Sequence, residues 1–216
     1  MRNNLGKVFF NWYEGINKVN KILWNEPLSD KDFLHHTSFL EVVDRSKINN
    51  AEIHYFTVSN GEKYICTAVV SVFEMNLDLF VQNKKIINFI KKIFPNLFKI
   101  KLVFCGIPVS SGQSNLWIDP EYTSQLDKYL HEISRKMDEL SQEYKALASS
   151  FKEFSSPTVS YLFNGLTKLN YSLCWSLPTV DLYLPETSQA YWKSLSHNRR
   201  RQIKTSLQKI GFTYLY

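Results

Sequence analysis

Two groups of polar residues in this sequence combine types that could do chemistry. The first is the stretch 193–209, which holds six basic residues and no carboxylate: Lys193, Arg199, Arg200, Arg201, Lys204 and Lys209. If the stretch is helical, Arg200 and Lys204 lie on one face, four residues apart. Arginine forks suit phosphate and carboxylate groups, so the pattern predicts an anion site. The simpler interpretation is a helix with a solvated basic face.

The second group is the charged pair Lys152-Glu153, followed by Phe154. It comes at the expected end of a strand over about residues 145–152. The ends of strands are where ligands collect in α/β proteins. The pair is therefore either one wall of a substrate pocket or a solvated strand end.

Several common sites are missing from the sequence. Its seven glycines never lie within five residues of each other, so neither a Walker loop nor a G-x-G-x-x-G turn is present. No His-x-x-x-His or Cys-x-x-Cys pair exists, which removes the common zinc signatures. His35 and His36 are adjacent on an expected helix and point about 100° apart, so we expect no metal there. A Ser/His/Asp triad is a spatial arrangement and stays open, although no G-x-S-x-G elbow supports one.

The composition and charge describe a packed globular chain. Of its 216 residues 44% are hydrophobic, and the formal net charge is +6. A second basic stretch, residues 84–101, holds six lysines and no acid, and the chain outside the two stretches has 14 basic and 20 acidic residues. Two basic patches on an otherwise acidic protein favour anionic ligands at defined places over a surface that coats nucleic acid.

The three cysteines and the apolar runs indicate the compartment. Cys66, Cys105 and Cys174 are an odd number set far apart among apolar residues, so we expect buried thiols in a reducing compartment. The N-terminus offers no apolar core of signal-peptide length, and no run approaches the ~18 apolar residues of a membrane span. These observations predict a cytoplasmic protein without a transmembrane segment.

The periodicity predicts strands alternating with helices. We expect strands near 7–13, 51–58, 63–74, 98–105, 145–152, 171–177 and 179–184, with Asn60-Gly61 marking a hairpin of type I′. We expect helices near 16–24, 29–46, 84–94 and 121–147, after Pro157, and over 187–209. Ser29 and Asp119 are the expected helix caps, and Phe33, Leu40 and Val43 the buried face of the second helix. The class is α/β or α+β with a mixed sheet.

Several segments, in this order, resemble a known family. "SLSHNRRRQIKTSLQKIGF", preceded by "LPTVDLYLPETSQAYWK", is similar to the segment that opens the second half of Fem-like acyltransferases of the GNAT superfamily, including the peptidoglycan biosynthesis/recognition type. Upstream, "ILWNEP", "FLHHTSFLEVVDRS", "VFCGIP" and "SSFKEF" resemble the N-terminal half of the same proteins. The similarity spans nearly the whole chain.

The resemblance implies a GNAT-like mixed sheet flanked by helices, with residues 1–186 as an N-terminal lobe and 187–216 as the start of a second lobe. It implies acyl transfer from acetyl-CoA or another acyl-CoA, or from an aminoacyl donor, to an amine, with no metal. GNAT proteins hold the donor pyrophosphate with a glycine-containing loop at a helix N-terminus, which this sequence lacks. We therefore expect the N-terminal half of an acyltransferase, inactive without a C-terminal half. Its substrate side would be lined by Lys152, Glu153, Arg199, Arg200, Arg201 and Lys204.

A different class of function also fits the charge. Two basic patches with aromatic neighbours could form a binding module for RNA or for an anionic membrane surface, and an amphipathic helix at 84–94 favours the membrane version. Binding of this kind would weaken steeply with salt, whereas recognition of an acyl thioester would not. A third alternative is a structural fragment without activity.

Overall fold

The structure is a computed structural model of the 216-residue chain, and it describes residues 8–76, 98–109, 112–154, 156–174 and 184–210. The chain forms two compact units, Met1–Leu177 and Pro178–Tyr216. The boundary expected after residue 186 lies inside the second unit, and the assignment of the two parts to separate lobes stays a prediction.

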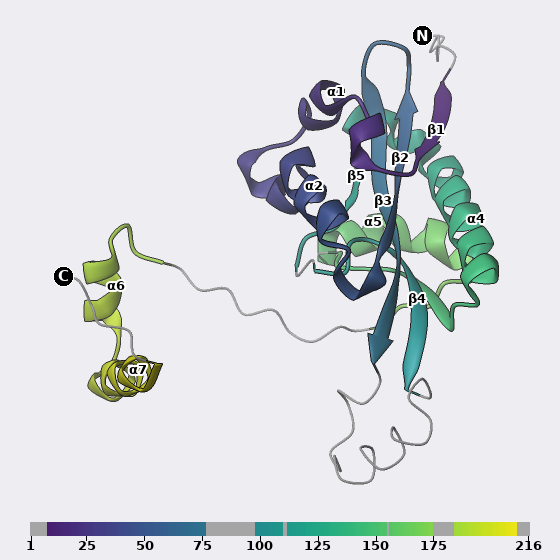
Figure 1. Ribbon diagram of the computed structural model, residues 1–216. Helices are drawn as coiled ribbons and strands as arrows, with labels where there is room; N and C mark the ends of the chain where they lie inside the picture. The colour runs from purple at the N-terminus through teal and green to yellow at the C-terminus, as the bar shows by residue number, and fades with distance from the viewer. Residues whose placement is uncertain (1–7, 77–97, 110–111, 155, 175–183, 211–216) are drawn as a thin grey trace. The chain divides into compact units, whose positions relative to one another are not determined.

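The first unit is built on one mixed sheet (Figure 1). The strands of its described part are β1 Phe9–Tyr13, β2 Glu52–Ser59, β3 Tyr64–Asn76, β4 Lys99–Cys105, β5 Leu116–Ile118 and β6 Ala148–Phe151. Their order is β1-β2-β3-β4-β6, with β5 paired to β3. Every pair is antiparallel except β4 with β6, which is parallel. The predicted mixed sheet is therefore confirmed.

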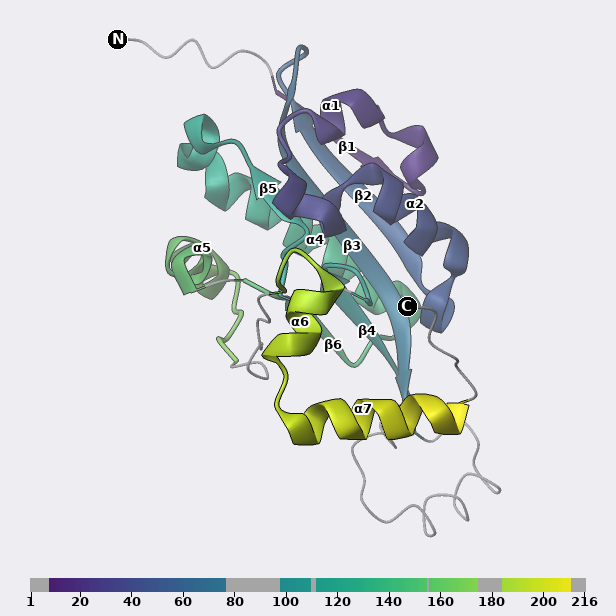
Figure 2. The ribbon, with the colours of Figure 1, turned by 90° about the vertical axis from the view of Figure 1, so that its left-hand side faces the viewer.

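Helices cover both faces of this sheet (Figures 1 and 2). One face carries α1 Lys21–Asn25 and α2 Thr37–Ser46, and the other carries α4 Leu126–Tyr144, with α5 Ser156–Lys168 packed beside α4. Short 3₁₀ helices are η1 Ile16–Lys18, η2 Asp30–His35, η3 Ile48–Asn50 and η5 Pro120–Gln125. The predicted arrangement of helices flanking a mixed sheet is confirmed.

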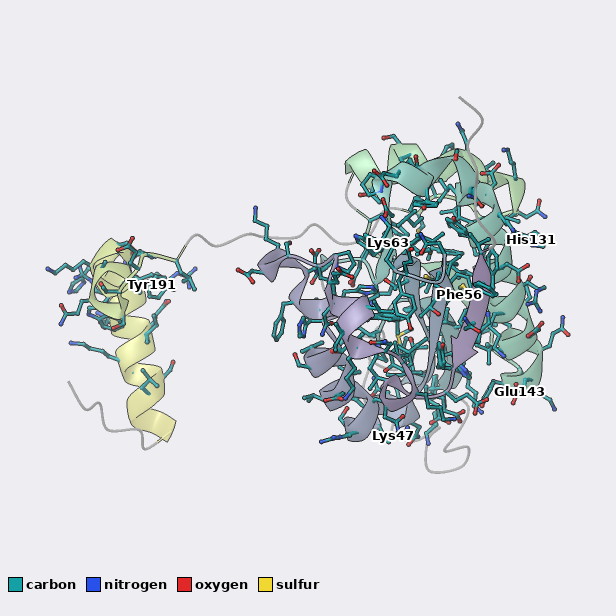
Figure 3. The ribbon with its side chains drawn as sticks, turned by 90° about the horizontal axis from the view of Figure 1, so that it is seen from above. Lys47, Phe56, Lys63, His131, Glu143 and Tyr191 are labelled. Atoms are coloured by element: carbon teal, nitrogen blue, oxygen red, sulfur yellow. The ribbon has the colours of Figure 1, made fainter. Side chains whose placement is uncertain are left out.

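The alternation of side chains along the strands decides which layer each one enters. On β2, Ile53 and Tyr55 join the cluster under α2, while Phe56 and Val58 join the cluster under α4. Phe56 lies in the interior of the unit (Figure 3). Because both faces are covered, β3 is buried from Tyr64 to Phe73, and only Thr67 and Ser71 interrupt the apolar residues of that stretch.

The hairpin between β2 and β3 is confirmed, but its turn is not of type I′. Within the loop only Gly61 has a positive φ, 98°, whereas a type I′ turn needs two such residues. Instead, the side-chain oxygen of Asn60 accepts hydrogen bonds from the amides of Glu62 and Lys63, both at 3.0 Å. The asparagine fixes this turn through its side chain.

The helix expected over 29–46 is two helices, separated at His36. The Ser29–Asp32 capping box forms as predicted, but it opens the 3₁₀ helix η2. His36 has extended backbone angles and caps α2. Leu40 and Val43 are buried as expected, whereas Phe33 is 58% exposed, so its expected place on the buried face is wrong.

The helix expected over 121–147 is also divided. Asp119 caps its start with Pro120 in the first turn, as predicted, but residues 120–125 are the 3₁₀ helix η5, and α4 ends at Tyr144. Leu147, the last residue of the expected helix, lies beyond α4 and is 70% exposed.

The cysteines and the remaining predicted segments of the first unit agree only in part with the sequence-based expectations. Cys66 and Cys105 are buried, and burial raises the pKa of Cys105 to about 12. Cys174 is exposed, so its predicted burial is wrong. Residues 171–174 form no strand. The helix expected at 84–94, the rest of the strand over 171–177 and most of the strand over 179–184 lie outside the described residues.

The second unit contains α6 Ser188–Ser194 and α7 His197–Ile210. The helix begins near Thr187 as expected, and Thr187 caps α6 by accepting a hydrogen bond from the amide of Ala190 at 3.1 Å. The single helix predicted over 187–209 is interrupted because Leu195 adopts extended backbone angles. None of the described side chains of this unit is buried.

Candidate functional site

The parallel pair β4 and β6 brings two strand ends to the same edge of the sheet. Their register runs from Leu102 opposite Ala148 to Cys105 opposite Phe151. The amide of Lys152 then donates to the carbonyl of Cys105 at 3.3 Å. The predicted charged pair Lys152-Glu153 therefore follows directly on a strand end, as the sequence indicated.

The Lys152 side chain is held in place by several contacts. Its ammonium nitrogen donates to the carbonyl of Ile107 at 3.1 Å and pairs with Oε1 of Glu153 at 3.1 Å. It also lies 5.4 Å from the ring centre of Phe104. The side chains of Lys152 and Glu153 are only 16% and 17% exposed. This is a largely desolvated ion pair, not a solvated strand end.

Glu153 has two unusual properties. Its φ is +64°, which is uncommon for a residue with a side chain. Its second carboxylate oxygen, Oε2, is buried and has no hydrogen-bond partner in the described part of the chain. A buried carboxylate oxygen without a donor is costly, so its place in this structure calls for an explanation.

Gly106 provides the space that the lysine occupies. Its φ is +146°, and a Cβ placed on it would lie 2.7 Å from Cγ of Lys152. The Ser71 hydroxyl donates to the Gly106 carbonyl at 2.6 Å, and the Gly106 amide donates to the carbonyl of Val69 at 2.8 Å. These two hydrogen bonds to β3 hold Gly106 in place. Because glycine has no side chain, Lys152 can lie across this position.

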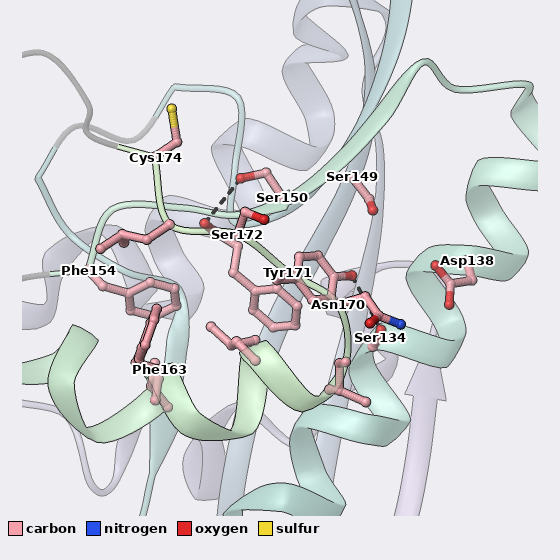
Figure 4. A pocket seen from close by; sticks show the side chains of 15 residues that line it. Ser134, Asp138, Ser149, Ser150, Phe154, Phe163, Asn170, Tyr171, Ser172 and Cys174 are labelled. Atoms are coloured by element: carbon pink, nitrogen blue, oxygen red, sulfur yellow. Dashed lines mark hydrogen bonds between the residues drawn. The ribbon is translucent and has the colours of Figure 1, made fainter.

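A pocket of about 410 Å³ lies on the α4–α5 side of β6 (Figure 4). Its apolar wall includes Phe151, Phe154, Leu162 and Leu166. Phe151 faces this side of the sheet, whereas the contact of Lys152 with Phe104 places the lysine on the α1–α2 side. The pocket and the charged pair therefore approach β6 from opposite faces.

Tyr171 forms the polar part of this pocket. Its hydroxyl lies 3.3 Å from the hydroxyl of Ser134, and its ring meets that of Phe151 edge-on with 5.0 Å between centres (Figure 4). Burial raises the pKa of Tyr171, which keeps the phenol neutral. Sequence reasoning missed Tyr171, because the residue lies in a segment that was expected to be a strand.

The basic residues predicted for the substrate side lie on α7, in the second unit. Lys204 has its ammonium nitrogen 5.9 Å from the ring centre of Trp192, and Arg199 donates to the side chain of Gln202 at 3.3 Å. Arg201 is exposed, while Nε of Arg200 is buried without a partner in the described residues. The structure describes these four residues and the pair Lys152-Glu153 in separate units, so their joint site stays a prediction.

In the part of the chain that the structure describes, no group of three or more His, Cys, Asp and Glu side chains is arranged to hold a metal ion. No described helix is both long and apolar enough to cross a membrane.

Comparison with protein-family models gave no match, and comparison with curated proteins gave none. Two solved structures are similar to the chain. One is an acetyltransferase from Trypanosoma brucei, with 11% identity and a TM-score of 0.41, covering 82% of this chain and 100% of the other. The other is a GCN5-related N-acetyltransferase from Ralstonia eutropha, with 10% identity and a TM-score of 0.40, covering 83% of this chain and 98% of the other. At this similarity neither structure assigns a function.

Proposed function

We propose that the first unit is a lobe of an N-acyltransferase, which moves an acyl group from a thioester such as acyl-CoA to an amine. The observation that carries the proposal is the end of β4 and β6, where Lys152 holds Glu153 with one carboxylate oxygen unpaired. The resemblance of the sequence to Fem-like proteins of the GNAT superfamily supports the same reaction class and suggests the peptidoglycan type.

Acyl transfer to an amine needs a group that accepts a proton. The amine nitrogen forms a bond to the thioester carbonyl carbon, the carbon–sulfur bond breaks, and the proton lost by the amine ends on the base or the thiolate. Oε2 of Glu153 is the free acceptor for that proton, and Lys152 positions the carboxylate through Oε1. The lysine ammonium also places positive charge near the developing oxyanion.

The donor requires a binding site for its phosphates. No glycine-rich phosphate loop occurs anywhere in the sequence. We propose that Arg199, Arg200, Arg201 and Lys204 meet the anionic groups of the substrates, and that a further C-terminal lobe supplies the main donor site. The chain alone is then not expected to sustain efficient turnover.

Thermal melts with acetyl-CoA and longer acyl-CoAs test the donor part of the proposal. A ligand at about 100 times its dissociation constant stabilises the native state by about 2.7 kcal/mol, a midpoint shift of roughly 5–10 °C at this size. We expect no shift. A shift that Arg200→Gln/Lys204→Gln removes would show that this chain holds the donor itself, against the argument from the missing loop.

Release of free thiol from acetyl-CoA in the presence of primary amines tests the reaction. We expect slow amine-dependent release at high protein concentration, reduced by about 100-fold or more in Glu153→Gln, the usual range for losing a general base. Glu62→Gln, in the exposed hairpin loop, is the matched control. Equal rates for the wild type and Glu153→Gln would contradict the proposed base.

A binding module is the second candidate, and one observation favours it. Helix α7 is rich in exposed basic residues, and Lys204 lies over Trp192, a combination that suits RNA or an anionic membrane surface. Binding of RNA or anionic vesicles that falls steeply between low and moderate salt would support this candidate over the first.

A further inference from the structure

A second hollow, of about 350 Å³, lies at the edge of the sheet where β1 ends. Strand β1 pairs with β2 only from Tyr13 opposite Tyr55 onward, so Glu52–His54 extends beyond it. The hollow is bordered by Glu14 after β1, by Asp44 near the end of α2, and by Lys136 and Glu143 on α4. We call it the edge notch, and it is separate from the β4–β6 end.

The edge notch has an excess of negative charge. Four carboxylates border it, those of Glu14, Asp44, Glu52 and Glu143, against the ammonium groups of Lys47 and Lys136. Asp44 is satisfied within the protein, because it accepts from the amide of Ile16 at 3.3 Å and pairs with Lys47 at 3.6 Å. Lys136 pairs outside the notch, with Glu139 at 3.7 Å.

The remaining three carboxylates are less well compensated. Glu52 accepts a hydrogen bond from the hydroxyl of Tyr144, a neutral donor. Glu14 and Glu143 make no ion pair in the described part of the chain. The uncompensated charge of the edge notch is therefore negative, and its carboxylates come from three separate segments: the residue after β1, strand β2 and helix α4.

The floor of the notch contains a buried group that lacks a partner. His54 is only 8% exposed, and its Nε2 is buried without a hydrogen bond to any described residue. Burial lowers the pKa of His54 and Lys136 lowers it further, against the opposing effect of Glu14, Glu52 and Glu143. The imidazole is therefore neutral near pH 7, and a neutral imidazole nitrogen can accept a hydrogen bond.

We propose that the edge notch binds a primary alkylammonium group, which donates one N–H to Nε2 of His54 and the others to the carboxylates of Glu14, Glu52 and Glu143. A compact ammonium carries three donors, which suits one ring nitrogen and surrounding carboxylates. The volume of the hollow leaves space for a short alkyl chain. An organic cation is favoured over a metal ion, because no described group of His, Cys, Asp and Glu is arranged for metal binding.

The ammonium group can belong to a free diamine or to a lysine side chain, and calorimetric titration of the full chain distinguishes them. The probes are 1,4-diaminobutane and Nα-acetyl-lysine amide, with MgCl₂ as a third titrant. Saturable binding of the first probe alone assigns the notch to free diamines, and binding of both assigns it to lysine side chains as well. No binding of either amine, or an equal response to Mg²⁺, overturns the proposal.

Paired variants locate the bound amine. We expect Glu14→Gln/Glu143→Gln to weaken binding about fivefold to tenfold, as expected for two partly exposed ion pairs. Glu62→Gln, on the exposed hairpin loop, should leave it unchanged. If instead Glu153→Gln abolishes binding and the notch variants do not, the amine binds at the β4–β6 end. That result overturns this inference and supports the proposed function.

The imidazole of His54 provides a direct signal. In ¹H–¹⁵N spectra of the histidine rings, the Nε2 resonance of His54, identified by its loss in His54→Gln, should move on addition of 1,4-diaminobutane. His131 lies on the exposed side of α4 and should not move (Figure 3). A stationary His54 signal at a saturating amine concentration overturns the proposal.

Discussion

At the scale of single residues, Gly106 and Lys152 show how two positions 46 apart depend on each other. The sequence marks Gly106 as part of a loop after a strand and Lys152 as part of a strand end. Only the parallel pairing of β4 and β6 brings them into contact, with 2.7 Å between a Cβ on the glycine and Cγ of the lysine. Lys152 can adopt the conformation in which it pairs with Glu153 because residue 106 is a glycine and has no side chain.

Gly106→Ala should destabilise the first unit by about 1–3 kcal/mol, because alanine is strained at this backbone conformation, and by a further amount from overlap with Lys152. Urea denaturation of the wild type and the variant measures the loss. Gly61→Ala is the matched control: its φ is also positive, +98°, but nothing lies within 4 Å of its Cβ. Gly61→Ala should lose only the stability that the backbone strain costs, because its new Cβ overlaps with no other atom.

A double-mutant cycle separates the two contributions of Gly106. Lys152→Ala removes the atoms that a Cβ at residue 106 would meet, so the double variant should lose less stability than the sum of the single changes. Strict additivity would mean that the glycine is required by its backbone conformation alone.

The predictability of the candidate site differs from residue to residue. Lys152 and Glu153 could be singled out because charge at the end of a strand is a local pattern. The positive φ of Glu153 and the role of Tyr171 could not, because both depend on contacts between segments far apart in the sequence. The edge notch was likewise invisible, since Glu14, Glu52 and Glu143 meet only in the fold.

At the scale of elements, the sequence predicted where helices and strands occur better than it predicted whether each helix is continuous. The break at His36 has a tertiary cause. The ring N–H of Trp24 donates to the carbonyl of His35 at 2.8 Å, and the amide of Thr37 donates to the side chain of Asn25 at 3.0 Å. These bonds satisfy backbone groups that a continuous helix would have paired, and helical periodicity contains no information about them.

The cap of η5 gives a prediction at this scale. Asp119 is 7% exposed, accepts from the amide of Glu121 at 2.9 Å and pairs with Lys63 at 2.6 Å. Burial acts to raise the pKa of Asp119, but the hydrogen bonds from Lys63 and Glu121 outweigh it, so its pKa is lowered. Asp119→Ala should cost about 1–2 kcal/mol in chemical denaturation.

Asp127, in the first turn of the following helix α4, is the comparison. It pairs with Lys168 at the same 2.6 Å, but both side chains are at least 60% exposed. Asp127→Ala should therefore change stability by less than about 0.5–1 kcal/mol. If the two variants were equally destabilised, capping and burial would not be the reason for the effect at Asp119.

At the scale of the whole molecule, the distribution of buried residues separates the two units. Among the described residues the three apolar clusters are all formed within Met1–Leu177, and they include Trp24, Phe56 and Leu162. Within 184–207, the part of the second unit whose side chains are described, no apolar side chain is more than partly buried; Leu195, Ile203 and Leu207 are examples. Among the described residues of this unit the burial of apolar surface is small, and it offsets little of the entropy of ordering the chain.

The chain 1–177 should therefore fold alone, with a cooperative melt within a few degrees of that of the full chain. The peptide 178–216 should be mostly unfolded in isolation, because helices of 7 and 14 residues are marginal in water without a packed face. Circular dichroism of both pieces measures this. A stable, cooperatively melting 178–216 would contradict the view that α6 and α7 depend on other surfaces. A non-cooperative 1–177 would show that the first unit requires the second, although all of its described core lies within its own residues.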